Sequence, residues 1–455
     1  MINQLSWKVG GQQGEGIEST GEIFAAALNR SGYYLYSYRH FSSRIKGGHT
    51  NNKIRVSTNQ VRSMADDLDI LVAFDQETID VNFHELRQGG VVIADEKAKP
   101  KIPDEAKASL FAIPFTKIAT DLGTSLMKNM VALGASSAVL GLPVAFFDEI
   151  VKEIFGRKGD KVVEKNKEAI RQGAECFNKV GSGQVMHLAE GDAKKRMYMI
   201  GNDAIGLGAL AGGARFMAAY PITPASDIME YMIKTLPEFG GTVIQTEDEM
   251  AACTMCIGSN YGGVRAFTAS AGPGLSLMME SIGLAGMTET PLVIVDTQRG
   301  GPSTGLPTRQ EQSDLLAMIH GSHGEIPKIV MAPSTVEEAF YDMAEAFNLA
   351  DRYQCPVIFL SDLQLSLGKQ TVEPLDYSRV KIDRGKLHQD GELPPLENKD
   401  YYKRYEPTDD GISKRIIPGT KNGIYHVTGV EHDATGKPSE SPVNRKEQME
   451  KRLRK

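Results

Sequence analysis

Three side chains of different chemistry follow three apolar segments of the chain. Thr223 stands in "YPITP", Glu249 in "QTEDEMAA" and Arg299 in "VIVDTQRGGPSTGLPT", where Gly300-Gly301 and Thr308 come next. Together, a hydroxyl, a carboxylate and a guanidinium could hold a carboxylate substrate and polarise a heterocycle, because arginine binds a planar carboxylate bidentately. Each motif alone is more often structural, as Pro-Ile-Thr-Pro is typical of a connecting turn. Their combination favours a site.

Strands and helices alternate around these motifs. "GTVIQTE", "VRAFTAS", "PLVIVDTQ", "PKIVMAP" and "CPVIFLSD" predict strands. "TPASDIMEYMIKTL", "DEMAACTMCIGSNYG" and "STVEEAFYDMAEAFNLAD" predict helices, the last with Ser334 and Glu337 in capping-box spacing. In an open α/β sheet, ligands bind at the carboxyl ends of the strands. We therefore expect Thr223, Glu249 and Arg299 to meet at that edge, with the glycine loop "TASAGPG" at a fourth strand end.

The first part of the chain predicts a separate sheet of the same class. "WKVGG", "LDILVAFD" and "GGVVIAD" are apolar runs typical of buried parallel strands, and "FFDEIVKEIFG" has a helical period. "STGEIFAAALNRSG" predicts a helix that begins with Ser19 and Glu22 in capping-box spacing. The predicted fold class is α/β, with open-sheet domains at about 1–190 and 191–385. Residues 386–455 are rich in proline, glycine and charge, which predicts an extended linker ending in a polar helical fragment, "NRKEQMEKRLRK".

Composition and charge narrow the class of protein. The chain of 455 residues is too long for one core, and its 41% hydrophobic and 24% charged residues are ordinary for a globular protein. The net charge of −7 gives no reason to expect nucleic acid or an anionic membrane as partner. The chain begins without the pattern of a signal peptide, and no apolar run approaches the ~18 residues of a membrane span. Four cysteines are a sparse set that suits a reducing cytoplasm.

Two motifs of the first part could contact an anion. "GGQQGEGIEST" places glycines between a strand and a helix, where backbone amides could cradle an anionic group. Its glycine spacing departs from the dinucleotide fingerprint, so a tight turn is the simpler interpretation. "SRIKGGHTNNKIRVS" sets Arg44 and Lys46 beside Gly47 and Gly48, as either a solvated basic turn or a contact with a phosphate-bearing or partner surface.

The cysteines and histidines predict no metal site. Cys253 and Cys256 form one C-x-x-C in a helical stretch, and one pair cannot ligate an iron–sulfur cluster or a closed zinc site. A redox dithiol is one interpretation; buried helix cysteines are the commoner one. His320 and His323 have metal-like spacing without a third ligand close by, which favours loop histidines.

The motifs together resemble a known family. "YPITPASD", "QTEDEMAA", "ASAGPGLSLMMESIGLAGMTETPLVIVDTQRGGPSTGLPT" and "SRIKGGH" are similar to the α subunit of 2-oxoacid:ferredoxin oxidoreductases. The similarity is to the 2-oxoglutarate type, in which a γ-like domain precedes the α chain, and it covers about residues 5–435. It implies a γ-like domain at 1–190 and a thiamine-diphosphate pyrimidine-binding domain at 191–385.

The resemblance implies roles for single residues. Glu249 corresponds to the catalytic carboxylate that contacts N1′ of the aminopyrimidine, with Tyr220 and Pro221 beside the cofactor. Thr223, Arg299 and Thr308 correspond to substrate-binding residues. The prolines of "YPITP" would then pre-order the Thr223 hydroxyl toward the substrate, which lowers the entropic cost of binding. Arg44, Lys46, Gly47 and Gly48 would contact coenzyme A or another subunit.

The resemblance also implies a partner. The family shares thiamine diphosphate with a β subunit, which carries the diphosphate, Mg²⁺ and an iron–sulfur cluster. This chain has neither the Gly-Asp-Gly motif for the diphosphate and magnesium nor cysteines for a cluster, so it would be active only with that β subunit. The chain stops about where family members continue into a further domain, which suggests that the usual C-terminal domain is missing.

The implied reaction is the oxidative decarboxylation of 2-oxoglutarate to succinyl-CoA and CO₂, with electrons passed to ferredoxin. The alternatives are the same chemistry on pyruvate or branched-chain 2-oxoacids, or a non-catalytic assembly subunit. A cytoplasmic location is expected.

Overall fold

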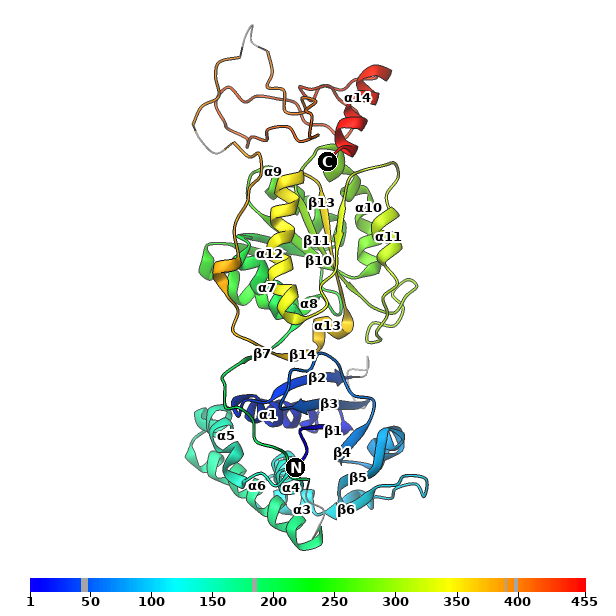
Figure 1. Cartoon of the computed structure of the whole chain (residues 1–455), viewed down its shortest axis with the longest axis vertical. Coiled ribbons are helices and arrows are strands. Elements are labelled where there is room, and N and C mark those ends of the chain that lie inside the picture. Colours follow the sequence, from blue (N-terminus) through cyan, green and yellow to red (C-terminus); the bar gives the residue numbers. More distant parts are fainter. Residues whose placement is uncertain (42–47, 182–185, 389–390, 397–399) are drawn as a thin grey trace. The chain divides into compact units, whose positions relative to one another are not determined.

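The computed structural model describes residues 1–41, 48–181, 186–388, 391–396 and 400–455 (Figure 1). They form two compact units, residues 1–199 with 368–374 and residues 200–367 with 375–455. The chain therefore leaves the first unit, builds most of the second, and returns to the first for one short segment. Both units are α/β, as predicted. The expected domain limits at 190 and 385 stay a prediction.

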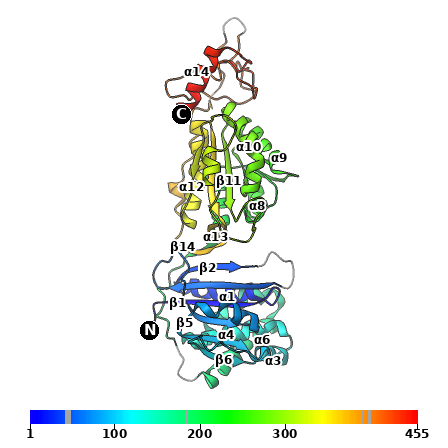
Figure 2. The same ribbon diagram turned by 90° about the vertical axis from the view of Figure 1, so that its right-hand side faces the viewer.

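The first unit contains an eight-stranded mixed sheet in the order β6-β5-β4-β1-β3-β2-β14-β7. Neighbours β1, β4, β5 and β6 are parallel, whereas β3 pairs antiparallel with both β1 and β2. The three apolar runs noted above are β1, β4 and β5. Figures 1 and 2 show β14 beside β2, to which it is antiparallel. The strands are β1 (Gln4–Gln12), β2 (Tyr34–His40), β3 (His49–Ser57), β4 (Leu68–Ala73), β5 (Leu86–Asp95), β6 (Ser109–Ile113), β7 (Met197–Ile200) and β14 (Lys369–Val372).

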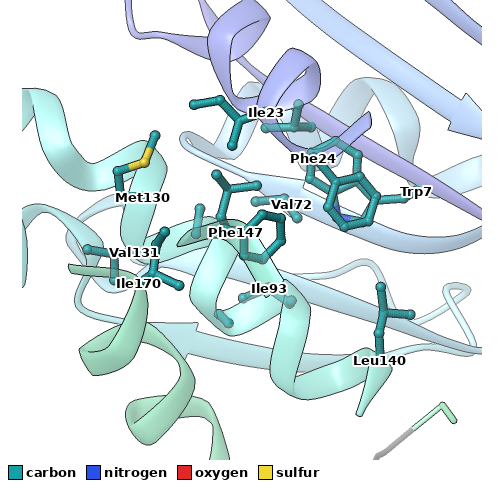
Figure 3. Packing of buried hydrophobic residues seen from close by; sticks show 14 of the residues in the cluster. Trp7, Ile23, Phe24, Val72, Ile93, Met130, Val131, Leu140, Phe147 and Ile170 are labelled. Atoms are coloured by element: carbon teal, nitrogen blue, oxygen red, sulfur yellow. The ribbon is translucent and has the colours of Figure 1, made fainter. Parts of the chain in front are cut away.

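A large apolar core joins this sheet to its helices (Figure 3). Trp7 of β1 stacks on Phe24 of α1 with ring centroids 4.3 Å apart. Helices α4 and α6 approach so closely that a Cβ on Gly134 would overlap the carbonyl oxygen of Ile170. Helix α1 begins at Ile17, and its N-cap residue is Gly16, which has φ 84° and no side chain to cap the helix. The prediction that the helix begins at Ser19 is therefore wrong. The helices are α1 (Ile17–Arg30), α2 (Gln76–Asn82), α3 (Phe115–Asp121), α4 (Lys128–Leu140), α5 (Asp148–Phe155) and α6 (Asp160–Val180).

The second unit has a six-stranded sheet in the order β12-β13-β11-β10-β8-β9, with every neighbouring pair parallel. The chain passes from β8 to β9 on one side and then to β10 on the other side of β8. A reversal of this kind creates a crevice at the carboxyl ends of the strands, where open α/β sheets bind ligands. The strands are β8 (Phe216–Ala219), β9 (Thr242–Gln245), β10 (Ala266–Ser270), β11 (Leu292–Gln298), β12 (Ile329–Met331) and β13 (Pro356–Asp362).

Helices pack on both faces of this sheet: α7 against α8 and α12, and α9 against α10. Helix α12 is capped by Thr335, whose hydroxyl accepts a hydrogen bond from the Glu338 amide, and Glu338 accepts one from the Ser334 amide. The expected capping pair, Ser334 and Glu337, is therefore wrong by one residue. The helices are α7 (Gly201–Ala211), α8 (Ser226–Thr235), α9 (Glu249–Tyr261), α10 (Gly272–Met287), α11 (Leu315–His320), α12 (Val336–Tyr353) and α13 (Leu363–Leu367).

The segment after β14 is extended, and buried ion pairs attach it to the second unit. Asp351 of α12 binds Arg265 at 2.9 Å and Arg415 at 2.6 Å. The polar fragment at the end is α14 (Pro442–Leu453), which buries Lys451 against Glu289. Its sequence shows no apolar face because the buried face is itself polar and ion-paired. Among the described helices, none is long and apolar enough to cross a membrane.

Candidate active site

Four motifs follow four adjacent strands of the second unit. "YPITP" follows β8, Glu249 comes four residues after the end of β9, "AGPG" follows β10, and Arg299 comes directly after β11. The sheet order places these strands as β11-β10-β8-β9. Since all are parallel, their carboxyl ends lie at one edge. The edge expected from the sequence therefore exists, and the loops at the β8–β10 reversal carry the motifs.

Arg299 and Thr223 are in direct contact. The Arg299 Nη1 donates a hydrogen bond of 2.6 Å to the Thr223 carbonyl oxygen, and its Nη2 donates one of 3.1 Å to the carbonyl oxygen of Thr304. Arg299 is 6% exposed, and burial lowers the pKa of its guanidinium. Nothing acidic in the described part of the chain forms an ion pair with it, and its Nε has no acceptor there. A buried cation bonded only to carbonyl dipoles fits an anionic ligand.

The loop that carries Thr223 is fixed by a residue that the sequence did not single out. Asn202, near the start of α7, donates a 2.8 Å hydrogen bond from Nδ2 to the carbonyl oxygen of Pro224. The Ile222 carbonyl oxygen accepts a hydrogen bond of 3.0 Å from the Ser226 amide, which ties the loop to α8. Thr223 is half-buried and Tyr220 is 40% exposed. The loop therefore presents these side chains from a well-anchored backbone.

Glu249 is the first residue of α9 and is 6% exposed. Asp248 caps the helix by accepting a 2.7 Å hydrogen bond from the Ala251 amide, so the position of Glu249 is set by the helix start. No residue that the structure describes donates a hydrogen bond or forms an ion pair with the Glu249 carboxylate. The carboxylate faces Gly274, where an added Cβ would lie 2.8 Å from Glu249 Oε1 and overlap Ser270 Oγ. Only glycine at this position allows that close approach.

A buried acceptor without a protein donor, beside a glycine that leaves no room for a side chain, fits a ligand that brings its own donor. A protonated ring nitrogen is such a donor, and an aminopyrimidine carries one when it shares a proton with a carboxylate. The residues present therefore fit the aminopyrimidine of thiamine diphosphate.

Thr308 lies on the loop that begins at Arg299. The Gly300 amide donates to the Arg309 carbonyl oxygen at 3.0 Å, and the Leu306 amide donates to the Gly300 carbonyl oxygen at 2.7 Å. Thr308 is half-exposed between these closures. Within the described chain it makes no hydrogen bond to Thr223, Glu249 or Arg299. The structure thus places it on the same loop without joining it to the other site residues.

The anion-binding candidates of the first unit are only partly described. Arg44, Lys46 and Gly47 lie outside the described residues. The Gly48 carbonyl oxygen accepts a 3.1 Å hydrogen bond from Gln13, in the glycine-rich turn between β1 and α1. A cavity of about 380 Å³ opens beside this turn; its lining includes Gly14, Gly16, Ser19, Arg39, Phe41 and Thr50.

The cysteine pair is buried rather than reactive. Cys253 and Cys256 lie in the core side of α9, each with 0% exposure. Burial raises the pKa of the Cys253 thiol to about 12, and it raises the pKa of Cys256 as well. Thiols that stay protonated are poor nucleophiles and ligands, so the commoner interpretation of the pair fits. His320 and His323 are exposed, and the described residues contain no group of three ligands that could hold a metal ion.

Comparison with known proteins matches both units. Residues 207–451 match the family "Pyruvate flavodoxin/ferredoxin oxidoreductase, thiamine diP-bdg", and residues 6–176 match "Pyruvate ferredoxin/flavodoxin oxidoreductase". The 2-oxoacid:ferredoxin oxidoreductase subunit alpha of Sulfolobus sp is 36% identical over 99% of this chain and 78% of its own length. The 2-oxoglutarate synthase subunit KorA of Methanothermobacter marburgensis is 41% identical over 56% of this chain and 66% of its own.

A solved structure shares the whole architecture. The 2-oxoglutarate:ferredoxin oxidoreductase from Magnetococcus marinus, with 2-oxoglutarate, coenzyme A and succinyl-CoA bound, has a TM-score of 0.93 and 37% identity. The match covers 100% of this chain and 78% of that one. A relative so similar over nearly the full length, together with a thiamine-diphosphate-binding domain around Thr223, Glu249 and Arg299, settles the family. The chain belongs to the α subunits of the 2-oxoacid:ferredoxin oxidoreductases.

Proposed function

We propose that the chain supplies the substrate-binding and pyrimidine-binding part of an active site that converts 2-oxoglutarate and coenzyme A to succinyl-CoA and CO₂, with ferredoxin as electron acceptor. One observation carries this proposal: the buried Arg299 guanidinium lies against the Thr223 backbone and has no acidic partner in the described chain. A 2-oxoacid presents a planar carboxylate, which matches the fork of arginine. Arg299 and the Thr223 hydroxyl would bind that group, with Thr308 farther along the loop.

Glu249 would act on the cofactor. Bound thiamine diphosphate supplies the nucleophilic carbon and the electron sink that decarboxylation of a 2-oxoacid requires. Glu249 would hold a proton between its carboxylate and N1′ of the aminopyrimidine, in a short charge-assisted hydrogen bond. The Glu249 side chain is 6% exposed and lies against Gly274, so little water would reach that bond, which would strengthen it. Tyr220 and Pro221, at the start of the anchored loop, would contact the same ring.

The remaining parts of the reaction are assigned to partners. We propose that a β subunit holds the diphosphate with Mg²⁺ and an iron–sulfur cluster, and that it passes electrons to ferredoxin. Arg44, Lys46, Gly47 and Gly48 are proposed to contact coenzyme A or another subunit. A cytoplasmic location stays a prediction.

The choice of 2-oxoglutarate rests on the names of two relatives, the KorA subunit of Methanothermobacter marburgensis and the Magnetococcus marinus enzyme. Pyruvate is the second candidate, because both matching families are described as pyruvate oxidoreductases. The two candidate substrates share the 2-oxoacid group and differ only in the rest of the molecule. Arg299 and Thr223 would serve either substrate.

The test uses the full chain, tagged and purified from its native cell with the subunits that accompany it. Coenzyme A-dependent reduction of a viologen dye is measured with 2-oxoglutarate, pyruvate and 2-oxoisovalerate. The highest kcat/KM with 2-oxoglutarate supports the proposal. A higher kcat/KM with pyruvate or 2-oxoisovalerate would identify that acid as the substrate and leave the proposed chemistry unchanged. Loss of all activity from an intact complex would contradict the catalytic role.

A further inference from the structure

Two carboxyl groups that no role above uses meet beside the first turn of α10. Asp296 of β11 is fully buried, and neither of its carboxyl oxygens receives a hydrogen bond from a donor in the described chain. The carboxyl group of Asp314, whose Oδ2 is likewise buried without a hydrogen-bond partner in the described chain, is its polar neighbour. Burial raises the pKa of Asp296 well above its usual range, and Asp314 raises it further. A fully buried carboxyl group and a half-buried one so close together cannot both stay ionised, because like charges repel and burial penalises each.

Among the residues that the structure describes, the groups around the pair include no cation. From β10, Ser270 is the cross-strand neighbour of Asp296, and its hydroxyl has no partner in the described chain. From α10, Gly272 lies against Asp314, where a Cβ would be 2.7 Å from Asp314 Oδ2. From the loop, the Ser313 hydroxyl donates to Asp314 Oδ1 at 3.3 Å. The one other charged group that acts on the pair, as far as the chain is described, is Glu311, and it is negative.

A shared proton is the remaining way to neutralise one of the two charges. With a proton on Asp296, its O–H donates a hydrogen bond to the Asp314 carboxylate, and the pair carries one negative charge instead of two. Release of that proton to solvent leaves two carboxylates in contact, which repel each other.

The pair stands at the base of the loop that carries Arg299. The loop leaves β11 after Gln298 and returns at Asp314, whose amide donates a 3.0 Å hydrogen bond to the Gln298 side chain. Within the loop, Arg299 binds the carbonyl oxygen of Thr304. The contact between Asp296 and Asp314 therefore closes a loop that has Arg299 at one end.

We propose that Asp296 and Asp314 share one proton, and that this proton closes the base of the loop 299–314 and so positions Arg299. The pair acts through Arg299 and does not touch substrate, so both are positioning residues. The consequence for substrate binding rests on the function proposed above for Arg299; the shared proton and the closure of the loop do not.

The first experiment detects the proton directly in the full chain, purified with its accompanying subunits. Infrared difference spectra at about pH 7 compare the wild type with Asp296→Asn, Asp314→Asn and Glu311→Gln. We expect a neutral carboxylic acid band in the wild type and in Glu311→Gln, its loss in Asp296→Asn, and a shift of its frequency in Asp314→Asn, where burial still keeps Asp296 protonated but the shared hydrogen bond has changed. Glu311→Gln is the matched control, because it removes an exposed carboxylate from the same loop. A wild-type spectrum without this band overturns the proposal.

The second experiment follows the loop itself. Hydrogen exchange of the peptide 299–314 is measured from about pH 6 to about pH 9, each time relative to Asp296→Asn at the same pH. The asparagine amide keeps a hydrogen bond to Asp314 but carries no titrating proton. We expect exchange in the wild type to rise several-fold over the variant on the alkaline side. Equal exchange at every pH overturns closure by the shared proton. Should Asp296→Asn fail to fold, Asp314→Asn provides the same comparison.

Kinetics then separates this inference from the proposed function. KM for 2-oxoglutarate should rise about tenfold on the alkaline side in the wild type, and much less in Asp296→Asn, while kcat changes little. If the loop responds to pH and KM does not, the pair closes the loop as proposed, and the assignment of Arg299 as a substrate ligand is the part that is overturned.

Discussion

Gly274, at the start of α10, lies directly against Glu249, at the start of α9. A Cβ on Gly274 would be 2.8 Å from the Cγ and the Oε1 of Glu249 and would overlap Ser270 Oγ. The Ser270 hydroxyl must rotate away from such a Cβ, and the Glu249 side chain, whose two atoms are also closer than contact distance, must shift as well. Gly274→Ala should therefore lower kcat/KM about 100-fold, since displacing a catalytic group by about 1 Å costs that much. Steady-state kinetics of the assembled complex measures this.

Gly283 of the same helix is the matched control. A Cβ at this position meets nothing within 4 Å, so Gly283→Ala should leave kcat/KM unchanged and stabilise the helix by about 0.5–1 kcal/mol. Equal activity in the two alanine variants would show that the contact between Gly274 and Glu249 does not set the position of the carboxylate.

Glu249→Gln tests the carboxylate itself. Glutamine has nearly the same shape but cannot take the proton shared with N1′, so we expect kcat to fall by about 10²- to 10⁴-fold while the complex still assembles. Glu247→Gln, which changes an exposed carboxylate two residues away, should have wild-type kinetics. Wild-type kcat in Glu249→Gln would mean that the assignment of Glu249 is wrong.

Arg299→Lys should raise KM for the 2-oxoacid by about ten- to a hundredfold, because lysine keeps the charge but loses the two parallel hydrogen bonds. Thermal unfolding should change little, since Arg299 has carbonyl partners and no buried ion pair in the described chain.

Arg265→Lys should give the reverse result. Arg265 is also buried, but it is paired with Asp351, and it also donates to the Gly212 carbonyl oxygen and Asn348. We expect a loss of about 2 kcal/mol in the free energy of unfolding with KM unchanged. Unfolding and kinetics measured on both variants separate the two classes of buried arginine; a raised KM in Arg265→Lys alone would contradict both assignments.

The placement of Thr223 and Arg299 could be predicted from the sequence, because it follows from the geometry that all parallel sheets share. Parallel strands end at one edge, so residues that follow neighbouring strands meet there without any knowledge of side-chain packing. The apolar runs of β4, β5 and β11 are fully buried and could be recognised for that reason alone.

Other parts of the site depend on distances that no local pattern contains. Asn202 reaches Pro224 from a different helix, and Asp296 meets Asp314 only after the loop between them folds back. The predictions of the helix-capping residues were wrong for a related reason. Serine, threonine and glycine neighbours compete for the cap, and tertiary packing selects among them, so α12 uses Thr335 instead of Ser334.

The buried face of the polar helix α14 is the clearest example of a feature that could not be predicted from the sequence. Hydrophobic periodicity detects a buried face only when that face is apolar. Here Glu289 is fully buried between Lys451 and Lys455, with the Lys455 Nζ 2.6 Å from Glu289 Oε2. Burial alone would raise the pKa of Glu289, but Lys455, Lys451 and Arg404 outweigh it and lower the pKa to about 2.

This ion pair predicts how stability depends on pH. The folded pKa of Glu289 lies below the ordinary value of 4.5, so its contribution is complete above about pH 4.5 and is lost as pH falls toward about 2. Lys451→Met should lower the free energy of unfolding by about 1–3 kcal/mol near neutral pH, since Lys455 still holds the carboxylate, and should weaken its decline in acid. Lys446→Met, on the exposed side of α14, should match the wild type at every pH. Chemical unfolding at several pH values measures all three proteins; an acid-induced decline as steep in Lys451→Met as in the wild type would show that the pair with Lys451 does not hold α14 in place.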